Sequence, residues 1–494
     1  MSFLESHLLS ALIFGPLVLA AISALLAAFV PSDKVQRLWA LIGTTALAAL
    51  SLPLWTRFNS GTAAFQFVEN LSWIPSLKIN YAVGVDGISV LLVLLTTLIT
   101  PLCVLASWTY IQKRVAEFMI ALLVMEAAMV GVFCALDTVL FFIFWEAMLI
   151  PMSLMIGVWG GPRRIYASLK FFIYTMAGSI FLLVSIIAIR LQTGSFGIQE
   201  AMGHPFSQGF QLWIFAAFFL SFAIKVPMFP FHTWLPAAHV EAPTAGSVIL
   251  ASVLLKMGTY GFLRFCLPMA PYATQTFGPY IIWAAVIGVI YGGFTALAQG
   301  DMKKLVAYSS VAHMGFAVMG IFSLNQQGLE GATLVMINHG ITTGALFIMV
   351  GILYERTHTR ELDKLAGLGA KIPVFTAFFG IFCLSSLAFP GTNSFVGEFL
   401  VLAGGFKASP WAVVCVVPGV VAAAAYMYRV LQKFAYGSED NPEHHGVSDL
   451  SLREIITLAP LLLGVFWVGL HPQPLIKIMH VSLAHVLEQA QKHL

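Results

Sequence analysis

The sequence has very little charge for its length. Only 10% of its 494 residues are charged and 59% are hydrophobic, and the mean hydropathy is +0.89. Soluble domains carry roughly 25% charged residues, so this composition excludes a soluble protein and predicts an all-α polytopic membrane protein in contact with the lipid bilayer. The net charge of +3 is small, and the basic residues are spread over short loops, which gives no indication of nucleic-acid binding.

The sequence also lacks the motifs of cofactor sites. It has no Gly-x-Gly-x-x-Gly after a strand, no Walker loop and no Cys-x-x-Cys. The five cysteines lie within or beside apolar runs, which predicts small core residues without disulfides and without zinc or iron–sulfur ligation. We therefore expect no metal and no redox cofactor in this chain. The energy for any pumping must come from an ion gradient or from a partner.

Fourteen apolar segments are long enough to cross a bilayer, for which about 20 residues are needed. They lie near 8–30, 36–55, 84–107, 116–134, 138–158, 170–190, 211–238, 246–267, 278–299, 304–322, 331–353, 373–405, 411–435 and 454–471. The first segment follows no basic region and no small-residue cleavage site, so it is predicted to be a retained span. Residues 56–83 alternate in polarity, which predicts a hairpin or an extended surface loop. Residues 475–494 have helical apolar spacing among charges, typical of an interfacial amphipathic helix.

The distribution of lysine and arginine predicts the orientation. With the N-terminus outside, sixteen of the 25 basic residues fall on the inward side, seven fall outside and two, Lys225 and Lys256, lie within spans. Cytoplasmic loops carry an excess of lysine and arginine. This pattern predicts an even number of spans with both termini on the outer side.

Two of the spans are interrupted by proline in the same way. Phe229-Pro230 breaks the seventh span and Phe389-Pro390-Gly391 breaks the twelfth. Proline inside a membrane helix frees backbone groups that protein or water must satisfy. Five spans separate the breaks, so the two helices run in opposite directions, as in transporters built from inverted repeats with a site at the broken helices.

Four ionisable residues lie well inside spans: Glu146, Lys225, Lys256 and Glu398. Each charge at a helix centre costs roughly 2.5–3.5 kcal/mol on an insertion scale. One lysine with one carboxylate would suit an ion pair that fixes helix packing, but two lysines and two carboxylates in one bundle favour a proton relay. Burial and neighbouring charge can both shift a lysine between its charged and neutral forms. We therefore predict that Lys225 paired with Glu146 acts as a switch, with Lys256 as the next carrier.

Two histidines lie between Lys256 and Glu398 in chain order. His313 and His339 fall in spans ten and eleven. A lone histidine in an apolar span is as readily a packing residue as a carrier, but the position of these two in the series favours the relay. Glu126 is a further possible functional residue. Four others near span ends are interpreted as cap, gate or water-entry residues: Asp137, His232, His239 and Glu241.

Three stretches identify a family resemblance. The long run from Lys225-Val-Pro-Met-Phe-Pro-Phe-His to Ala-Gly-Ser247 resembles the signature of the antiporter-like subunits shared by respiratory complex I and multisubunit cation/proton antiporters. Gly300-Asp-Met-Lys-Lys and the Phe-Trp-Glu146 stretch are similar to other hallmarks of that family. Glu398, in Leu387-Ala-Phe-Pro-Gly-Thr-Asn-Ser-Phe-Val-Gly-Glu, is typical of the M type, because L and N types carry lysine at the matching place.

The resemblance implies about fourteen transmembrane helices with two inverted five-helix repeats and broken helices 7 and 12. The corresponding segments are 1–110, with the outer hairpin; 111–270, spans four to eight; 271–440, spans nine to thirteen; and 441–494, the last span and interfacial helix. It implies a proton path through Glu146, Lys225, Lys256, His313, His339 and Glu398. Lys225 lies before its break but Glu398 lies after its own, so the two are not strictly equivalent.

The resemblance also implies the complex and the membrane to which the chain belongs. The chain would be a non-catalytic, proton-translocating subunit of NADH:quinone oxidoreductase in a bacterial inner membrane, beside L-type and N-type chains. FMN, iron–sulfur clusters and quinone would belong to partner subunits. The alternatives are a subunit of a cation/proton antiporter, a subunit of a membrane-bound hydrogenase complex, and a passive scaffold in which the charges only hold helices together.

Overall fold

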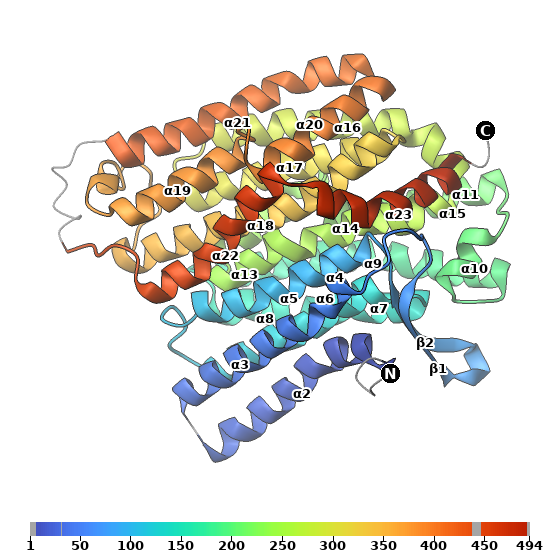
Figure 1. The fold of residues 1–494 in the computed structure, drawn as a ribbon, viewed down its shortest axis with the longest axis horizontal. Coiled ribbons are helices and arrows are strands. Elements are labelled where there is room, and N and C mark those ends of the chain that lie inside the picture. The colour runs from blue at the N-terminus through green and yellow to red at the C-terminus, as the bar shows by residue number, and fades with distance from the viewer. Residues whose placement is uncertain (1–5, 31, 437–445, 492–494) are drawn as a thin grey trace.

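The chain forms a bundle of long, apolar helices (Figure 1). The computed structural model describes residues 6–30, 32–436 and 446–491. Within that part of the chain, thirteen helical stretches are long and apolar enough to cross a membrane. The predicted class, an all-α polytopic membrane protein, is therefore confirmed.

The helices through the first interrupted span are α2 (Leu8–Phe29), α3 (Asp33–Ser51), α4 (Pro53–Thr56), α5 (Ser89–Ala106), α6 (Val115–Cys134), α7 (Thr138–Ala147), α8 (Leu149–Trp159), α9 (Arg164–Thr193), α10 (Ile198–Gly203), α11 (Gln208–Lys225) and α12 (Trp234–Glu241).

The second half of the bundle contains the most deeply buried helices. Its elements are α13 (Thr244–Ile249), α14 (Leu255–Gly261), α15 (Leu267–Met269), α16 (Pro271–Leu297), α17 (Met302–Phe322), α18 (Gln326–Thr357), α19 (Pro373–Ser386), α20 (Asn393–Ala408), α21 (Pro410–Tyr436), α22 (Leu452–Leu470) and α23 (Gln473–Gln491). Nearly every residue of α17 and α18 is buried, whereas α9 and α21 expose many large apolar side chains. The exposed apolar faces suit contact with lipid or with another membrane subunit.

Both proline-containing regions interrupt their helices. α11 ends at Lys225, a short 3₁₀ turn spans Phe231–Thr233, and α12 begins at Trp234. α19 ends at Ser386 and α20 begins at Asn393. The predicted twelfth span, 373–405, therefore consists of two helices that are each too short to be counted among the thirteen. Whether the two halves of the bundle are inverted repeats stays a prediction.

The helix that carries Lys256 is irregular and completely buried. Between α13 and α15 it contains two π-helical segments, Leu250–Leu254 and Phe262–Cys266. Every residue from Thr244 to Met269 is buried. A π-helical turn disrupts the regular i→i−4 hydrogen-bond pattern, and such turns occur frequently at functional sites.

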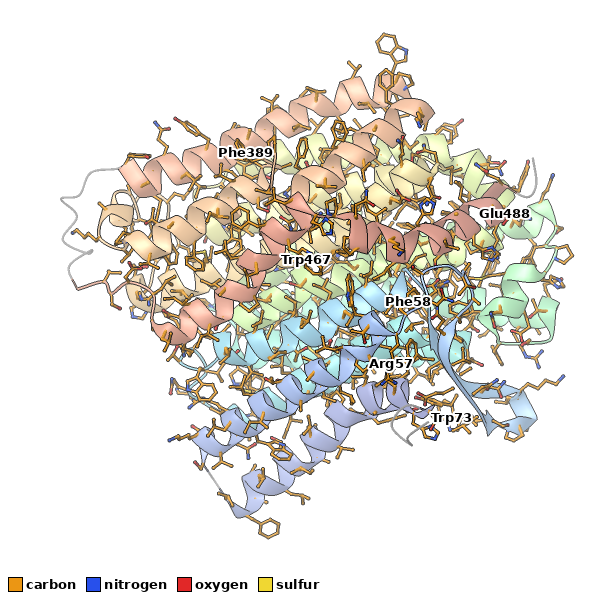
Figure 2. All side chains as sticks on the ribbon, viewed as in Figure 1. Arg57, Phe58, Trp73, Phe389, Trp467 and Glu488 are labelled. Carbon is orange, nitrogen blue, oxygen red and sulfur yellow. The ribbon has the colours of Figure 1, made fainter. Side chains whose placement is uncertain are left out.

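Residues 66–85 form the predicted hairpin. β1 (Gln66–Ile74) pairs antiparallel with β2 (Ile79–Val85), with Asn70 opposite Ala82. Trp73 lies on this hairpin and is half-exposed (Figure 2). Glu69 holds the hairpin to the start of α2, because its Oε1 accepts hydrogen bonds from the backbone of Leu9 and Ser10.

The C-terminal helix α23 packs across the ends of three spans. Ser482 Oγ accepts from Gly87 N just before α5, Gln275 of α16 donates to Ala490 O, and His480 lies 2.5 Å from Glu330 of α18. A helix is confirmed over Gln473–Gln491, and its interfacial position stays a prediction. In Figure 1 the start of α2 and the end of α23 lie toward the end of the bundle that carries the hairpin. Which side of the membrane this is stays a prediction.

Some expectations need correction or fall outside the described residues. Four of the five cysteines are buried as predicted, but Cys415 is exposed on α21. Residue 110 lies in the loop between α5 and α6, and residue 270 lies between α15 and α16; the division into segments stays a prediction. The boundary at 440 lies outside the described residues.

Candidate functional site

Lys256 and His339 are joined by a direct hydrogen bond. Lys256 Nζ, on α14, lies 2.6 Å from His339 Nδ1 on α18. The ammonium also donates to Ala251 O, a carbonyl in the preceding π-helical turn, and this oxygen is 3.1 Å from His339 Nδ1. When Lys256 is protonated it has only donors, so His339 Nδ1 is then the acceptor in this pair. The π-helical turn thus supplies a backbone carbonyl to the buried ammonium.

His313 and Glu398 form a second joined pair. His313 Nδ1, on α17, lies 2.9 Å from Glu398 Oε1 on α20, just after the second break. The rings of His313 and His339 lie 5.8 Å apart between centroids. Four of the six predicted relay residues therefore follow one another through three packed helices and the start of α20: Lys256, His339, His313 and Glu398. In space, His339 lies before His313, so the two occur in the reverse of their chain order.

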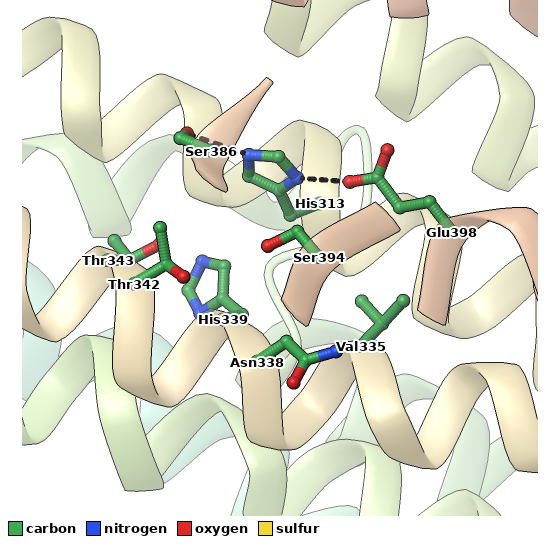
Figure 3. A pocket seen from close by; sticks show the side chains of 9 residues that line it. All are labelled: His313, Val335, Asn338, His339, Thr342, Thr343, Ser386, Ser394 and Glu398. Atoms are coloured by element: carbon green, nitrogen blue, oxygen red, sulfur yellow. Dashed lines mark hydrogen bonds and ion pairs between the residues drawn. The ribbon is translucent and has the colours of Figure 1, made fainter. Parts of the chain in front are cut away.

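A small polar cavity lies between the two histidines (Figure 3). It is bounded by His313, His339, Ser386, Ser394 and Glu398, among others. The centre of a water-sized sphere can occupy about 10 Å³ of it, which is close to the space that one buried water needs. His339 Nε2 has no hydrogen-bond partner in the described part of the chain. The cavity thus has the polar lining and the size for one water between the rings.

Polar side chains satisfy the backbone at the second break. Asn338 Nδ2 donates to Asn393 O over 2.7 Å, and Ser385 Oγ donates to Asn393 Oδ1 over 2.6 Å. Thr342 Oγ1 lies 2.7 Å from Ser385 Oγ. In an apolar environment such partners are what makes an interrupted helix tolerable. They hold α20, and with it Glu398, against α18 and α19.

Lys225 and Glu146 are not joined by a direct ion pair in the described part of the chain. Lys225 is 2% exposed. Its Nζ lies 3.6 Å from Met148 Sδ and 4.8 Å from the centre of the Trp145 ring. Glu146 is half-buried, and within the described ranges it makes no ion pair of 4.0 Å or less. α7 places the Trp145 ring rather than Glu146 against the ammonium, but Glu146 is the charged group whose field acts on Lys225. The pairing of Lys225 with Glu146 as a switch stays a prediction.

Lys225 and Lys256 lie on helices that approach closely. A side-chain carbon at Gly258 would lie 2.6 Å from Val226 Cγ2 and 2.9 Å from Phe222 O, so only glycine permits this spacing. The two lysines are thus placed on neighbouring backbones, but no hydrogen-bonded group joins them in the described chain. The structure brings together the second part of the predicted series by hydrogen bonds, whereas Lys225 and Glu146 have no direct hydrogen bond to it in the described residues.

Two buried basic residues were misjudged from the sequence. Lys303 and Arg264 were counted with the basic residues outside the spans, but Lys303 is only 8% exposed and Arg264 only 4%. Arg264 Nη2 donates to Asp86 Oδ2 over 2.7 Å, and Lys303 Nζ donates to Ala242 O over 2.6 Å. The polar residues of the cavity, such as Asn338 and Ser386, were also missed, since isolated small polar residues in apolar helices give no distinctive pattern.

The fold and this row of buried ionisable groups define an antiporter-like membrane protein with interrupted helices. The profile of the family described as "NADH:quinone oxidoreductase/Mrp antiporter, TM" matches residues 135–424, and that of "NADH-ubiquinone oxidoreductase chain 4, amino terminus" matches residues 16–132. The chain belongs to the family of NADH:quinone oxidoreductase chain 4, whose bacterial members are named subunit M.

The alignments with named relatives cover nearly the full length of this chain and of each relative. The chain is 44% identical to NADH-ubiquinone oxidoreductase chain 4 of Arabidopsis thaliana, with 97% of each chain covered. It is also 44% identical to NADH-quinone oxidoreductase subunit M of Rhodobacter capsulatus, covering 98% of this chain and 96% of the relative. A chain of respiratory complex I from Thermus thermophilus superposes with a TM-score of 0.89 at 31% identity, covering 97% of this chain and 99% of that one.

The antiporter likeness is one of fold. A chain of the Mrp complex from Dietzia sp. superposes with a TM-score of 0.84, but the identity is 22% and only 52% of that chain is covered. This similarity shows the shared architecture alone.

Proposed function

We propose that the chain is a proton-translocating membrane subunit of a multisubunit NADH:quinone oxidoreductase. The observation that carries the proposal is the buried series in which Lys256 bonds His339 and His313 bonds Glu398, with a small polar cavity between the two rings. Buried ionisable groups in membrane helices mark ion pathways in general. The relatives named as chain 4 and subunit M support an oxidoreductase complex in preference to an antiporter.

The residues move protons and do not transform a substrate. A protonated Lys256 can pass its proton to His339 Nδ1, to which it is already hydrogen-bonded. A water in the cavity would connect His339 Nε2 with the His313 ring, and His313 Nδ1 is already bonded to Glu398. Each hand-over is between groups within hydrogen-bond reach or separated by one water, which is the geometry that proton transfer needs.

The energy for this transfer comes from elsewhere in the complex. Moving one charge against the membrane potential costs about 2.3 kcal/mol per 100 mV. We assign quinone reduction, FMN and the iron–sulfur clusters to partner subunits, and L-type and N-type chains to the positions beside this one. In this proposal, the coupling step is a change in the electrostatic interaction between Lys225 and Glu146.

The membrane and the orientation of the chain follow from its assignment to NADH:quinone oxidoreductase. We place the chain in a bacterial inner membrane with both termini on the outer side, because most of its basic residues then face inward. The hairpin and α23 would in that case cover the outer ends of the spans.

The experiment is a pumping assay on the assembled complex in inside-out vesicles. NADH-driven acidification and NADH:quinone turnover are measured together for Lys256→Met and for a matched exposed lysine, Lys407→Met. We expect the Lys256 variant to lose acidification by at least about tenfold, with normal assembly on native gels and an unaffected control. Normal coupled pumping in an assembled Lys256→Met complex would contradict the proposal.

A further inference from the structure

The His313 ring is held between the two halves of the second interrupted span. Its Nδ1 lies 2.9 Å from Glu398 Oε1 on α20, and its Nε2 lies 3.4 Å from the hydroxyl oxygen of Ser386, the last residue of α19 (Figure 3). His313 itself belongs to α17. One imidazole ring thus contacts the residue that ends one half-helix and a carboxylate on the other half. The carboxylate is a member of the predicted proton path, whereas the Ser386 hydroxyl is not.

The Ser386 hydroxyl differs from other buried serines of this bundle. Serine in a helix commonly donates to a carbonyl of its own preceding turn, and Ser309 and Ser310 of α17 both donate to Val306 O. Ser386 is only 2% exposed. In the described chain its hydroxyl has no backbone acceptor, and its hydrogen-bond partner is His313 Nε2. This hydroxyl is therefore able to donate to the ring or to accept from it.

The bond to Glu398 determines which nitrogen of His313 can receive a proton. An ionised carboxylate only accepts hydrogen bonds, so His313 Nδ1 carries a hydrogen and donates it to Glu398 Oε1. In the neutral ring, Nε2 is then the nitrogen without a hydrogen. A proton that comes from His339 must enter His313 at Nε2. In the described residues, Ser386 Oγ is the protein atom within hydrogen-bond distance of that nitrogen.

Ser386 also borders the cavity between the two histidines. This cavity has the space for one water, and His339 Nε2 has no protein partner in the described part of the chain. A single water bonded to His339 Nε2 and to Ser386 Oγ would join the two rings through hydrogen bonds. A hydroxyl can accept one hydrogen bond while it donates another, so it can stand between a water and a bare ring nitrogen.

We infer that the Ser386 hydroxyl is a further proton-carrying group of the path, placed between the cavity water and His313 Nε2. In the transfer, protonated His339 gives its Nε2 proton to the water, and the water gives a proton to Ser386 Oγ. Ser386 at the same time gives its own hydroxyl proton to His313 Nε2. One proton enters the hydroxyl and one leaves it, so the hydroxyl is restored.

The last step uses the bond that His313 already makes. With a proton on each ring nitrogen, His313 passes the one on Nδ1 to the carboxylate of Glu398. The water and the hydroxyl gain no net charge, because each takes up one proton and releases one. The inference rests on the proposed proton-translocating function and adds one group to its path.

The separation of 3.4 Å between Ser386 Oγ and His313 Nε2 suits a bond that tightens during transfer. It is longer than the roughly 2.9 Å of a strong hydrogen bond, so the neutral ring is not held firmly at Nε2. Hydrogen bonds in a proton path often shorten only when the charge arrives. Protonated His313 is a charged donor, and bonds from charged donors are shorter and stronger than those between neutral groups.

The test compares Ser386→Thr with Ser386→Val in the assembled complex in inside-out vesicles. The two new side chains have nearly the same size and shape, but only threonine has a hydroxyl. We expect Ser386→Thr to keep NADH-driven acidification within about twofold of the parent and Ser386→Val to lose it by at least about tenfold. Equal pumping by the two variants, at any level, would overturn the inference, because the hydroxyl would then not be needed.

Ser386→Ala decides the case in which the two larger side chains prevent assembly. Its matched control is Ser310→Ala, a buried serine three residues before His313 whose hydroxyl donates to Val306 O. The control should keep full pumping. Ser386→Ala should lose acidification by at least about threefold, a smaller loss than for valine because alanine leaves space that a second water can fill. A Ser386→Ala complex that pumps as well as Ser310→Ala would overturn the inference.

Lys256→Met in the same assay separates this inference from the function on which it rests. If Lys256→Met loses pumping while Ser386→Thr and Ser386→Val pump equally, only the role of the hydroxyl is wrong. If an assembled Lys256→Met complex pumps normally, the translocating function itself is wrong. Native gels and NADH:quinone turnover are recorded for every variant, so that a defect in assembly is not taken for a defect in proton transfer.

Discussion

Lys256 Nζ lies 2.6 Å from His339 Nδ1, although Lys256 is completely buried and His339 is only 3% exposed. The two residues are 83 positions apart in the chain and meet because the helix of Lys256 packs against α18. A buried ammonium needs partners to offset its lost hydration. It finds them in one imidazole nitrogen and one carbonyl of a π-helical turn. The pair forms one end of the hydrogen-bonded series, and the carboxylate of Glu398 forms the other.

Replacing Glu398 by glutamine should separate proton transfer from packing. The amide keeps the size of the side chain and can still bond His313, so the α17–α20 contact and assembly should persist. Because an amide cannot take up and release a proton, coupled acidification should fall by at least about tenfold. Glu361→Gln, an exposed carboxylate on the same chain, serves as the control in the same vesicle assay. Full pumping by the assembled Glu398→Gln complex would remove Glu398 from the path.

Replacing Glu146 by glutamine tests the scaffold alternative. Because Glu146 makes no direct ion pair with Lys225 in this conformation, the substitution should leave the thermal midpoint of the complex nearly unchanged. Pumping, in contrast, should be strongly reduced if pairing occurs during turnover. Retained pumping together with lost stability would favour the scaffold.

Truncating Lys225 to alanine should abolish coupled quinone reductase activity without preventing assembly. The ammonium contacts Met148 and Trp145, so its removal leaves no unpaired buried charge behind. The loss should therefore appear in turnover and acidification. Assembly is followed on native gels, and Lys407→Ala provides the exposed counterpart. Normal coupled turnover in the assembled variant would eliminate Lys225 as a switch.

Arg264→Gln should behave differently, as a stability defect. Arg264 is paired with Asp86 over 2.7 Å, and both side chains are 4% exposed. Removing one partner of a buried pair leaves the other charge uncompensated, which costs about 3–5 kcal/mol. The expected result is a lower unfolding midpoint or poor assembly of the complex. Adding Asp86→Asn to Arg264→Gln should restore part of the stability, and a double-mutant cycle measures the coupling. An Arg264→Gln complex as stable as the parent would show that the pair contributes little.

Several elements could be predicted because their signals are local. Apolar length determines the spans, proline determines the interruptions after Lys225 and Ser386, and alternation of polarity determines the hairpin. The identities of Lys225, Lys256 and Glu398 also stand out, since a charge inside a span is costly wherever the helices pack. The family resemblance followed from the same residues. Each of these properties depends only on residues that are close together in the chain, so it can be predicted from the sequence.

The contacts within the site could not be predicted in this way. The sequence places His313 before His339, but packing sets His339 next to Lys256 and His313 next to Glu398. It gives no sign that the rotation of α7 places the Trp145 ring against the Lys225 ammonium. It counted Lys303 among the loop charges, whereas the fold buries its ammonium against the end of α12. The sequence by itself determined which ionisable groups lie within the membrane spans, because the free-energy cost of placing a charge in the bilayer is a property of each side chain. Only the tertiary structure decided which of them touch, because contacts depend on helix rotation and close packing between segments far apart in the chain.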